Sequence, residues 1–293
     1  MATTAERTAP EVSARPSPPR PRKQKRGWVL PTYTGIVIAY LFIPVAIMIL
    51  FGFNDFSGRF NLVWEGFTLR HYRSLLEIPE LTLALKNSLV IATLSTIVSV
   101  ILGTLIALAL TRFRFRGRSG LNLFIFLPMA TPEIVLGVSL LSMFVSVEVA
   151  RGFTTILIAH IMFSISYVVV TVKARTSGFD QHLEEAARDL GADPWTTFWT
   201  VTFPLIFPGI MAAALLVFVL SIDDYVITTF NAGAVLTLPL WIFGVSRFGI
   251  PAQVNVIGTL IFMLGVGYVV VSLLREHRGN KVEVPPAASG LGG

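Results

Sequence analysis

The sequence predicts an all-α integral membrane protein with six transmembrane helices. Charged residues make up only 14% of the 293 residues, against about 25% in ordinary soluble domains, and 54% are hydrophobic. The apolar residues are concentrated in six stretches, each about as long as the 20 residues needed to cross the hydrocarbon core of a bilayer. Those stretches are 34–53, 88–110, 121–147, 153–172, 207–230 and 254–274.

The six stretches hold 135 residues but only three formal charges, Glu133, Asp223 and Asp224. Because loops rich in Lys and Arg stay on the cytoplasmic side of a membrane, the distribution of these residues predicts the orientation. The two tails and the loops after the second and fourth stretches hold 17 of the 23 Lys and Arg residues. Both termini are therefore expected to be cytoplasmic.

The two ends of the chain differ in composition from the apolar part. Residues 1–27 are rich in Pro, Arg, Ala and Ser, so we expect a disordered basic cytoplasmic tail that contacts anionic lipid. A cleaved signal peptide does not fit, because the first apolar run starts late, has full span length and is followed by no small-residue cleavage site. The transmembrane domain is predicted over 28–277, with a flexible tail over 278–293.

Several functional classes are excluded by residue type. The chain has no cysteine, and its four histidines lack metal-ligand spacing. No glycine-rich phosphate-binding motif opens a helix. We therefore expect no metal or cofactor on this chain and no enzymatic activity of its own. The membrane orientation accounts for the net charge of +6, so no nucleic-acid partner is expected.

Two apolar stretches carry polar or small residues at helical spacing. The second has a stripe that predicts close packing of another helix: Ser88, Ala92, Ser95, Ser99 and Gly103. In the fourth, His160 has Ser164 one turn further on. An internally hydrogen-bonded histidine is the favoured interpretation of His160, and a proton relay is the alternative.

The third stretch contains two prolines, Pro128 and Pro132, which should kink or open the helix because each removes an amide donor. Glu133 follows the second kink directly. It is interpreted either as a gate or cation contact near water or as a member of a structural pair within the bundle.

The fifth stretch holds two adjacent acids, each of which costs about 2.5–3.5 kcal/mol at the centre of a membrane span. On a continuous helix, a single polar stripe forms from Ser221, Asp224, Thr228 and Asn231. Asp223 is rotated about 100° from that stripe. We therefore expect Asp224 to face a wet pathway and Asp223 to flank it or pair with a neighbouring helix. A buried structural network is the alternative.

Two longer loops are expected on the side of the membrane opposite to the termini. Residues 54–87 are too few for a separate domain and should cap the mouth of the helical bundle or pack on it. Residues 231–253 contain Gly233, Pro239, Gly249 and Pro251 with apolar residues between them, which is typical of a re-entrant or interfacial segment.

The loop between the fourth and fifth stretches, residues 173–206, predicts a helix–glycine–helix elbow. Gly191 fits a left-handed cap after a first short helix, and Asp193 and Pro194 are a typical start for a second one, expected to end before Pro204. Such an elbow outside the membrane suits docking to a soluble partner; a plain connector is the alternative.

This elbow resembles the E-A-A-x3-G-x9-I-x-L-P loop of permeases in ABC importers. The residues that match at the family spacing are Glu185, Ala186, Ala187, Gly191 and Pro204. Val201 and Phe203 stand at the I and L positions, which is a mild apolar departure. The Ser221–Asp224 and Leu127–Gly137 segments are similar to those of permeases of the spermidine/putrescine type.

The resemblance implies a permease subunit in a bacterial inner membrane that translocates a small cationic solute such as a polyamine. It also implies a second permease subunit, two cytoplasmic ATPase subunits that carry ATP and Mg, and a substrate-binding protein. The elbow would couple to the ATPases through the matched residues. The expected substrate pathway contains Ser221, Asp223, Asp224, Thr228 and Glu133. A secondary transporter or cation channel, a permease for another solute and a membrane scaffold are the alternatives.

Overall fold

The computed structural model describes residues 28–56, 58, 60–178 and 182–279, and their regular structure is helical. An isolated antiparallel bridge pairs Asn54 with Phe67. The helices are α1 (Val29–Phe51), α2 (Arg70–Arg73), α3 (Pro79–Arg112), α4 (Arg118–Ala130), α5 (Glu133–Ser146), α6 (Phe153–Ser177), α7 (His182–Asp189), α8 (Pro194–Thr197), the π-helical turn η1 (Phe198–Thr202), α9 (Phe203–Asp223), α10 (Val226–Asn231), α11 (Leu238–Val245) and α12 (Ala252–Gly279).

The chain forms two compact units that divide between Ala46 and Ile47, inside α1. The described part of the first unit is one apolar helical segment, and α1 has no buried residue. The second unit contains the other helices. The predicted N-terminal tail and residues 280–293 of the predicted C-terminal tail lie outside the described residues.

The predicted all-α membrane class is confirmed, with one interruption. Five helical segments are long and apolar enough to span a membrane: α1, α3, α6, the continuous run Pro194–Asp223, and Ala252–Ser272 within α12. The third predicted span is broken into α4 and α5, which are bent by 107°. The break lies at Thr131 and Pro132. Proline has no amide hydrogen to donate to the preceding turn, so the helix does not continue there.

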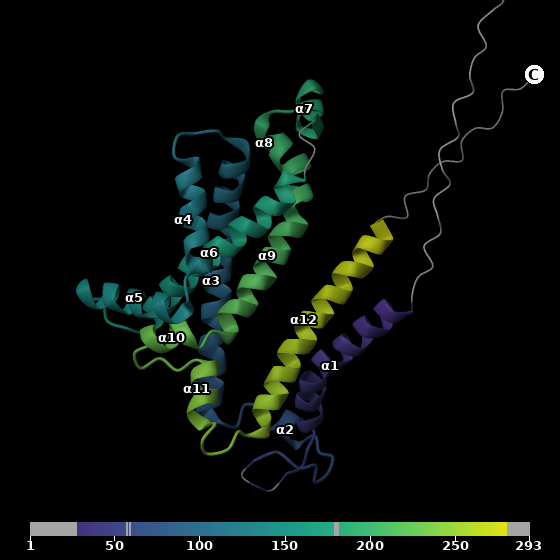
Figure 1. The fold of residues 1–293 in the computed structure, drawn as a ribbon, viewed down its shortest axis with the longest axis vertical. Helices are drawn as coiled ribbons and strands as arrows, with labels where there is room; N and C mark the ends of the chain where they lie inside the picture. The colour runs from purple at the N-terminus through teal and green to yellow at the C-terminus, as the bar shows by residue number, and fades with distance from the viewer. Residues whose placement is uncertain (1–27, 57, 59, 179–181, 280–293) are drawn as a thin grey trace, which may run out of the picture. The chain divides into compact units, whose positions relative to one another are not determined.

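Helices α3, α6 and α9 pack side by side and form the centre of the second unit (Figure 1). The predicted small-residue stripe on α3 is buried. A Cβ added at Gly103 would lie 2.7 Å from the Val168 Cβ on α6, so only glycine permits this approach. The apolar core between these helices includes Leu110, Val169 and Ile210, and α4 contributes to it.

The fifth predicted span is not one helix over 207–230, and that prediction is wrong at its end. Helix α9 ends at Asp223, Asp224 has an extended backbone with φ −63° and ψ 118°, and α10 starts at Val226. Asp224 accepts hydrogen bonds from the amides of Ile227 and Thr228 at the start of α10 (3.4 and 2.8 Å). An aspartate in this position caps a new helix rather than continuing the old one.

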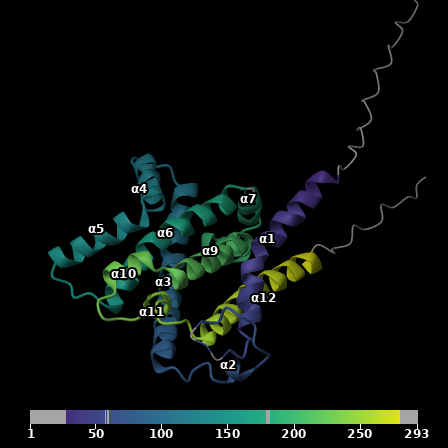
Figure 2. The same cartoon turned by 60° about the horizontal axis from the view of Figure 1, so that its bottom comes forward.

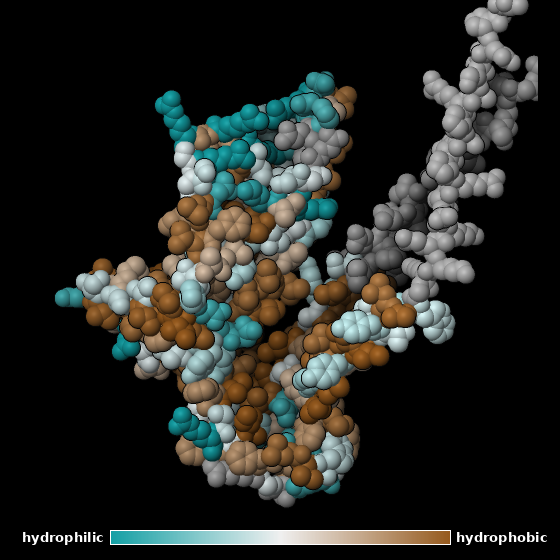
Figure 3. Space-filling model, viewed as in Figure 1, coloured by the Kyte–Doolittle hydropathy of each residue, from teal (hydrophilic) through white to brown (hydrophobic). Residues whose placement is uncertain are grey.

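Two segments between the long helices are held by specific hydrogen bonds. Asn54 organises the loop 54–66 by accepting from the amides of Glu65 and Gly66. In the segment 231–253, the short apolar helix α11 docks on α3, where the Leu238 amide donates to the Ser88 hydroxyl at 2.8 Å. In Figure 3, hydrophilic residues gather at the end of the second unit that carries the α3–α4 loop, α7 and α8, and hydrophobic residues cover its middle.

Candidate functional site

The two helix breaks meet at a cavity of about 580 Å³. One wall is the segment between α4 and α5, and the other is the segment between α9 and α10; Figures 1 and 2 both show α10 beside α5 and α6. The cavity lining contains all three acids of the apolar stretches, Glu133, Asp223 and Asp224. Three aromatic residues, Phe163, Tyr167 and Tyr225, also line it.

Glu133 stands at the first position of α5 and is exposed to the cavity. A carboxylate in the first turn of a helix is stabilised by the amide dipoles there. The bend after Pro132 therefore places the charge at a helix N-terminus beside open space, where it costs less than in the middle of a span.

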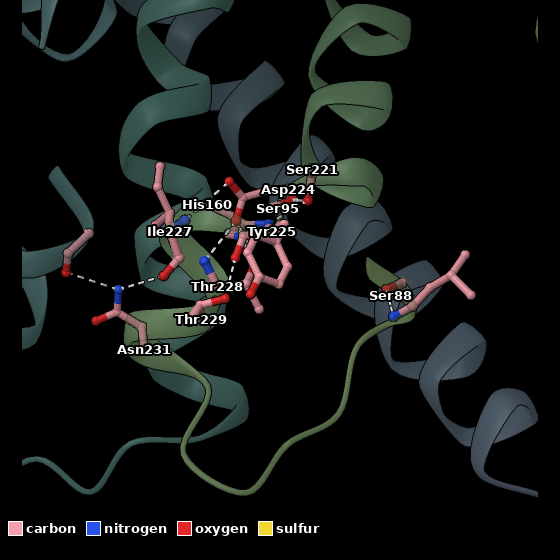
Figure 4. Close-up of polar contacts among 12 residues, drawn as sticks. Ser88, Ser95, His160, Ser221, Asp224, Tyr225, Ile227, Thr228, Thr229 and Asn231 are labelled. Atoms are coloured by element: carbon pink, nitrogen blue, oxygen red, sulfur yellow. Dashed lines mark hydrogen bonds and ion pairs between the residues drawn. The ribbon is translucent and has the colours of Figure 1, made fainter. Parts of the chain in front are cut away.

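The Asp224 side chain is largely buried and hydrogen-bonded. Its carboxylate is 7% exposed, and its Oδ2 accepts from the Thr228 hydroxyl at 2.7 Å. The His160 Nε2 lies 3.3 Å from the same oxygen and 3.0 Å from the Thr228 Oγ1 (Figure 4). His160 is 1% exposed, so the predicted internally bonded histidine is confirmed, with Asp224, Ser221 and Thr228 as partners in place of Ser164.

Asp223, in contrast to Asp224, is exposed. Its side chain is exposed at the end of α9, and it lines the carboxylate cavity together with Glu133. Asp223 and Tyr225 also line a second, apolar groove of about 930 Å³ between α9, α11 and α12. Both acids therefore line the cavity, but Asp223 is the more exposed of the two, because the backbone break at Asp224 interrupts the continuous helical stripe.

Three of the four predicted stripe residues still share one network despite the break. Ser221, Asp224 and Thr228 meet at His160, whereas Asn231 lies at the far end of α10. The Asn231 amide group donates to the Ile227 and Gly137 carbonyls (2.9 and 3.4 Å). Asn231 thus fixes α10 against α5.

The elbow has the predicted caps. Gly191 adopts a left-handed backbone with φ 89°, which suits glycine. Asp193 accepts from the Thr196 amide at 3.3 Å, and Pro194 is the first residue of α8. The hydrogen bonds from Thr196 lower the pKa of the Asp193 carboxyl, as is typical of a helix-capping aspartate.

The second elbow helix does not end before Pro204, and that prediction is wrong. It continues through η1 into α9, so that Pro194–Asp223 is one run of 30 residues. Within η1 the Phe203 amide donates to the Phe198 carbonyl, five positions back. This wider turn passes the chain across Pro204, which has no amide hydrogen to donate.

Glu184 anchors the elbow, a role that sequence reasoning missed. Its Oε1 accepts from the Thr202 hydroxyl at 2.5 Å and forms an ion pair with Arg112 at the end of α3. The Arg112 guanidinium also donates to the Thr202 Oγ1 at 3.1 Å. The neighbouring Glu185 is exposed and bonds to His182 within α7.

The elbow presents large apolar side chains to solvent. Leu190 is 89% exposed and Trp195 69%, and Leu183 and Trp199 are exposed beside them. Single exposed apolar residues are normal, but a group of four on one short elbow is typical of an interaction surface. Its matched residues Glu185 and Ala186 are exposed, and Ala187 is half-buried.

Comparisons with known proteins agree with the predicted family. The family described as the inner membrane component of binding-protein-dependent transport systems matches residues 99–277. The spermidine/putrescine transport system permease protein PotC of Haemophilus influenzae is 37% identical over 246 residues, which is 84% of this chain and 95% of PotC. The putrescine transport system permease protein PotI of Escherichia coli is 38% identical over 230 residues, 76% of this chain and 81% of PotI.

Solved structures support the fold. A bacterial ABC transporter involved in the import of the acidic polysaccharide alginate matches with a TM-score of 0.59 at 18% identity, covering 85% of this chain and 94% of the other. An amino acid ABC transporter matches with a TM-score of 0.53 at 19% identity, covering 72% and 99%. The chain therefore belongs to the family of inner-membrane components of binding-protein-dependent transport systems, the permeases of ABC importers.

Proposed function

We propose that this permease imports a polyamine such as spermidine or putrescine, delivered by a substrate-binding protein. The names of the relatives support this substrate class. The observation that carries the proposal is the exposure of two carboxylates, Asp223 and Glu133, to one cavity. Because an acid in a membrane span costs about 2.5–3.5 kcal/mol, acids exposed to a cavity there are best explained by a cationic solute.

The remaining lining fits the same chemistry. An alkylammonium ion binds carboxylates through charge and aromatic faces through cation–π attraction. Phe163, Tyr167 and Tyr225 supply such faces around the acids. Their apolar rings also suit the methylene segments of a polyamine. Ser221, Thr228 and Asp224, predicted for the pathway, support it from the adjoining network.

Both walls of the cavity are broken helices, which suits alternating access. Non-helical backbone at membrane depth is stable where it lines a cavity, and short half-helices can rotate about such breaks. In the proposed mechanism, the α4–α5 and α9–α10 breaks are the places where the pathway opens and closes. Nucleotide binding supplies the difference in free energy between the two states.

We propose that the elbow docks on a cytoplasmic ATPase subunit, and that ATP and Mg are held by that partner chain. The exposed Leu190, Trp195 and Glu185 support this role. The full assembly would contain a second permease subunit, two ATPases and the binding protein. The elbow and both termini would then face the cytoplasm, which agrees with the distribution of Lys and Arg.

The proposal is tested by uptake of radiolabelled spermidine and putrescine into proteoliposomes containing the whole transporter. Asp223→Asn and Glu133→Gln should each reduce uptake at least about tenfold, which requires only roughly 1.4 kcal/mol in the barrier. Ser142→Ala on α5, outside the cavity lining, is the control. Uptake that proceeds without ATP and binding protein, or is unchanged in both acid variants, would contradict the proposal.

A further inference from the structure

His160 on α6 bonds to both sides of the break between α9 and α10. Its Nδ1 lies 2.7 Å from the Ser221 Oγ in the last turn of α9. Its Nε2 lies 3.0 Å from the Thr228 Oγ1 in α10 and 3.3 Å from the Asp224 Oδ2 between the two helices. Figure 4 shows these groups converging on the imidazole. One side chain of α6 therefore spans the interruption.

The hydrogen-bond directions around His160 can be assigned from the chemistry of its partners. The Thr228 hydroxyl donates its proton to the Asp224 Oδ2, and an ionised carboxylate only accepts. The Nε2 must therefore carry a hydrogen and donate it toward these oxygens. On the other side, the Ser221 Oγ also lies 3.0 Å from the Ser95 Oγ of α3. The network thus connects α3, α6, α9 and α10.

The network accounts for how a carboxylate is tolerated at this depth. The Asp224 Oδ2 accepts from the Thr228 amide at 2.8 Å and the Thr228 hydroxyl at 2.7 Å, with the His160 Nε2 at 3.3 Å. A buried charge is stable only when it is paired and hydrogen-bonded in this way. Asp223, the adjacent residue, has no such arrangement and is exposed to the cavity.

We propose that His160 is a positioning residue of the cation pathway. By holding Asp224 across the break, it fixes the backbone from which Asp223 projects beside Glu133. The inference rests on the proposed function, since it assigns His160 a task in cation transport through that cavity. His160 acts through Asp224 and does not line the cavity itself.

The position of His160 also connects α6 to the movement of α10. Thr155, on the same helix, donates its hydroxyl to the Asn231 carbonyl at the end of α10 at 2.8 Å. Helix α6 is therefore hydrogen-bonded to α10 at two places, through His160 to Thr228 and through Thr155 to Asn231. A shift of α6 would carry α10 with it and move Asp223 relative to the cavity.

A matched pair of amide variants tests the role of the Nε2 donor. His160→Gln can place an amide group near the Nε2 position and still donate toward Asp224. His160→Asn reaches only the Nδ1 position and keeps a bond to Ser221 alone. We expect uptake per assembled complex to stay within about threefold of wild type in His160→Gln and to fall at least about tenfold in His160→Asn. Ser164→Ala, one turn away on α6, is the control.

A double-mutant cycle tests whether His160 acts through Asp224. If it does, adding Asp224→Asn to His160→Asn should cost much less than Asp224→Asn costs alone. Adding Asp223→Asn to His160→Asn should likewise cost less than Asp223→Asn costs alone, because a misplaced Asp223 has already lost its function. If His160→Asn does not assemble, Thr228→Val, which removes the hydroxyl between His160 and Asp224, replaces it in the same cycle.

The outcomes are distinct. Equal losses in His160→Gln and His160→Asn, or independent effects of His160 and Asp224 in the cycle, would overturn the positioning role. Wild-type uptake in Asp223→Asn and Glu133→Gln would instead refute the cation pathway itself. KM and Vmax, measured over a range of putrescine concentrations at equal amounts of complex, separate altered cation binding from altered turnover.

Discussion

Two aspartates in this protein begin a helix after an interruption, and their surroundings differ completely. Asp224 caps α10 at the cavity, where its carboxylate is 7% exposed and shares a network with His160 and Thr228. Asp193 caps α8 in the elbow, where it is exposed and bonds to Thr196. Helix capping by aspartate therefore occurs in two different environments. Asp193 caps a helix at an exposed turn, whereas Asp224 caps a helix with a carboxylate that is buried.

The comparison predicts the largest effect for removal of the buried cap. Asp224→Ala leaves the Thr228 hydroxyl without its acceptor and removes one of the two acceptors of the His160 Nε2–H, and a buried polar group left unsatisfied costs about 1–3 kcal/mol. The melting temperature of the purified complex should fall clearly, whereas Asp193→Ala should lower it far less. Equal decreases in the two variants would contradict the comparison.

An intermediate effect is expected at Glu184, which ties α7 to α3 and η1 through partly exposed groups. Glu184→Gln removes the ion pair with Arg112, worth up to about 1 kcal/mol at such a site. We expect the ATPase to remain bound while more ATP is hydrolysed per solute imported, because the elbow transmits its movement less firmly to α3.

Glu185→Gln is the matched variant, since Glu185 is the adjacent exposed carboxylate. It should weaken co-purification of the ATPase without changing the melting temperature of the permease. Exchanging the charges in Arg112→Glu/Glu184→Arg should restore the ratio of ATP hydrolysed to solute imported. If Glu184→Gln and Glu185→Gln behave alike, Glu184 has no separate anchoring role.

The smallest effect concerns pH. Hydrogen bonds from Thr196 lower the pKa of the Asp193 carboxyl in the folded elbow. Its stabilising contribution is therefore complete above the unfolded pKa, about 3.9, and disappears as the pH falls through the lower folded value. The difference in melting temperature between wild type and Asp193→Asn should be constant near neutral pH and vanish in acid. A difference that persists in acid would show that the Asp193 charge is not responsible.

Local signals were sufficient to predict the caps of the elbow helices and most of the spans. Gly191 and Asp193 act through their own backbone and nearest neighbours, so their pattern predicts the structure directly. The prolines of the third span likewise predicted its bend. The break at Asp224 also had a local signal, because aspartate is a preferred helix cap, but the apolar run on both sides favoured a continuous helix.

Long-range contacts could not be predicted from one sequence. His160 meets Ser221 and Thr228 from 61 and 68 positions away, and Arg112 meets Glu184 from 72 positions away. No periodicity identifies such partners, because they depend on which helices pack together. The relative exposure of Asp223 and Asp224 follows from those contacts, and for that reason the sequence alone could not predict it.

The continuous helical run from Pro194 to Asp223 joins the elbow to the cavity and would act as a lever arm between them. Its 30 residues correspond to a rod about 45 Å long. A tilt of only about 5° at the elbow end of such a rod would displace its other end by about 4 Å. That displacement is comparable to the width of a methylene chain. The π-helical turn near the elbow end carries the helical run across Pro204 without a break. A small tilt at the elbow would therefore produce a larger displacement at Asp223.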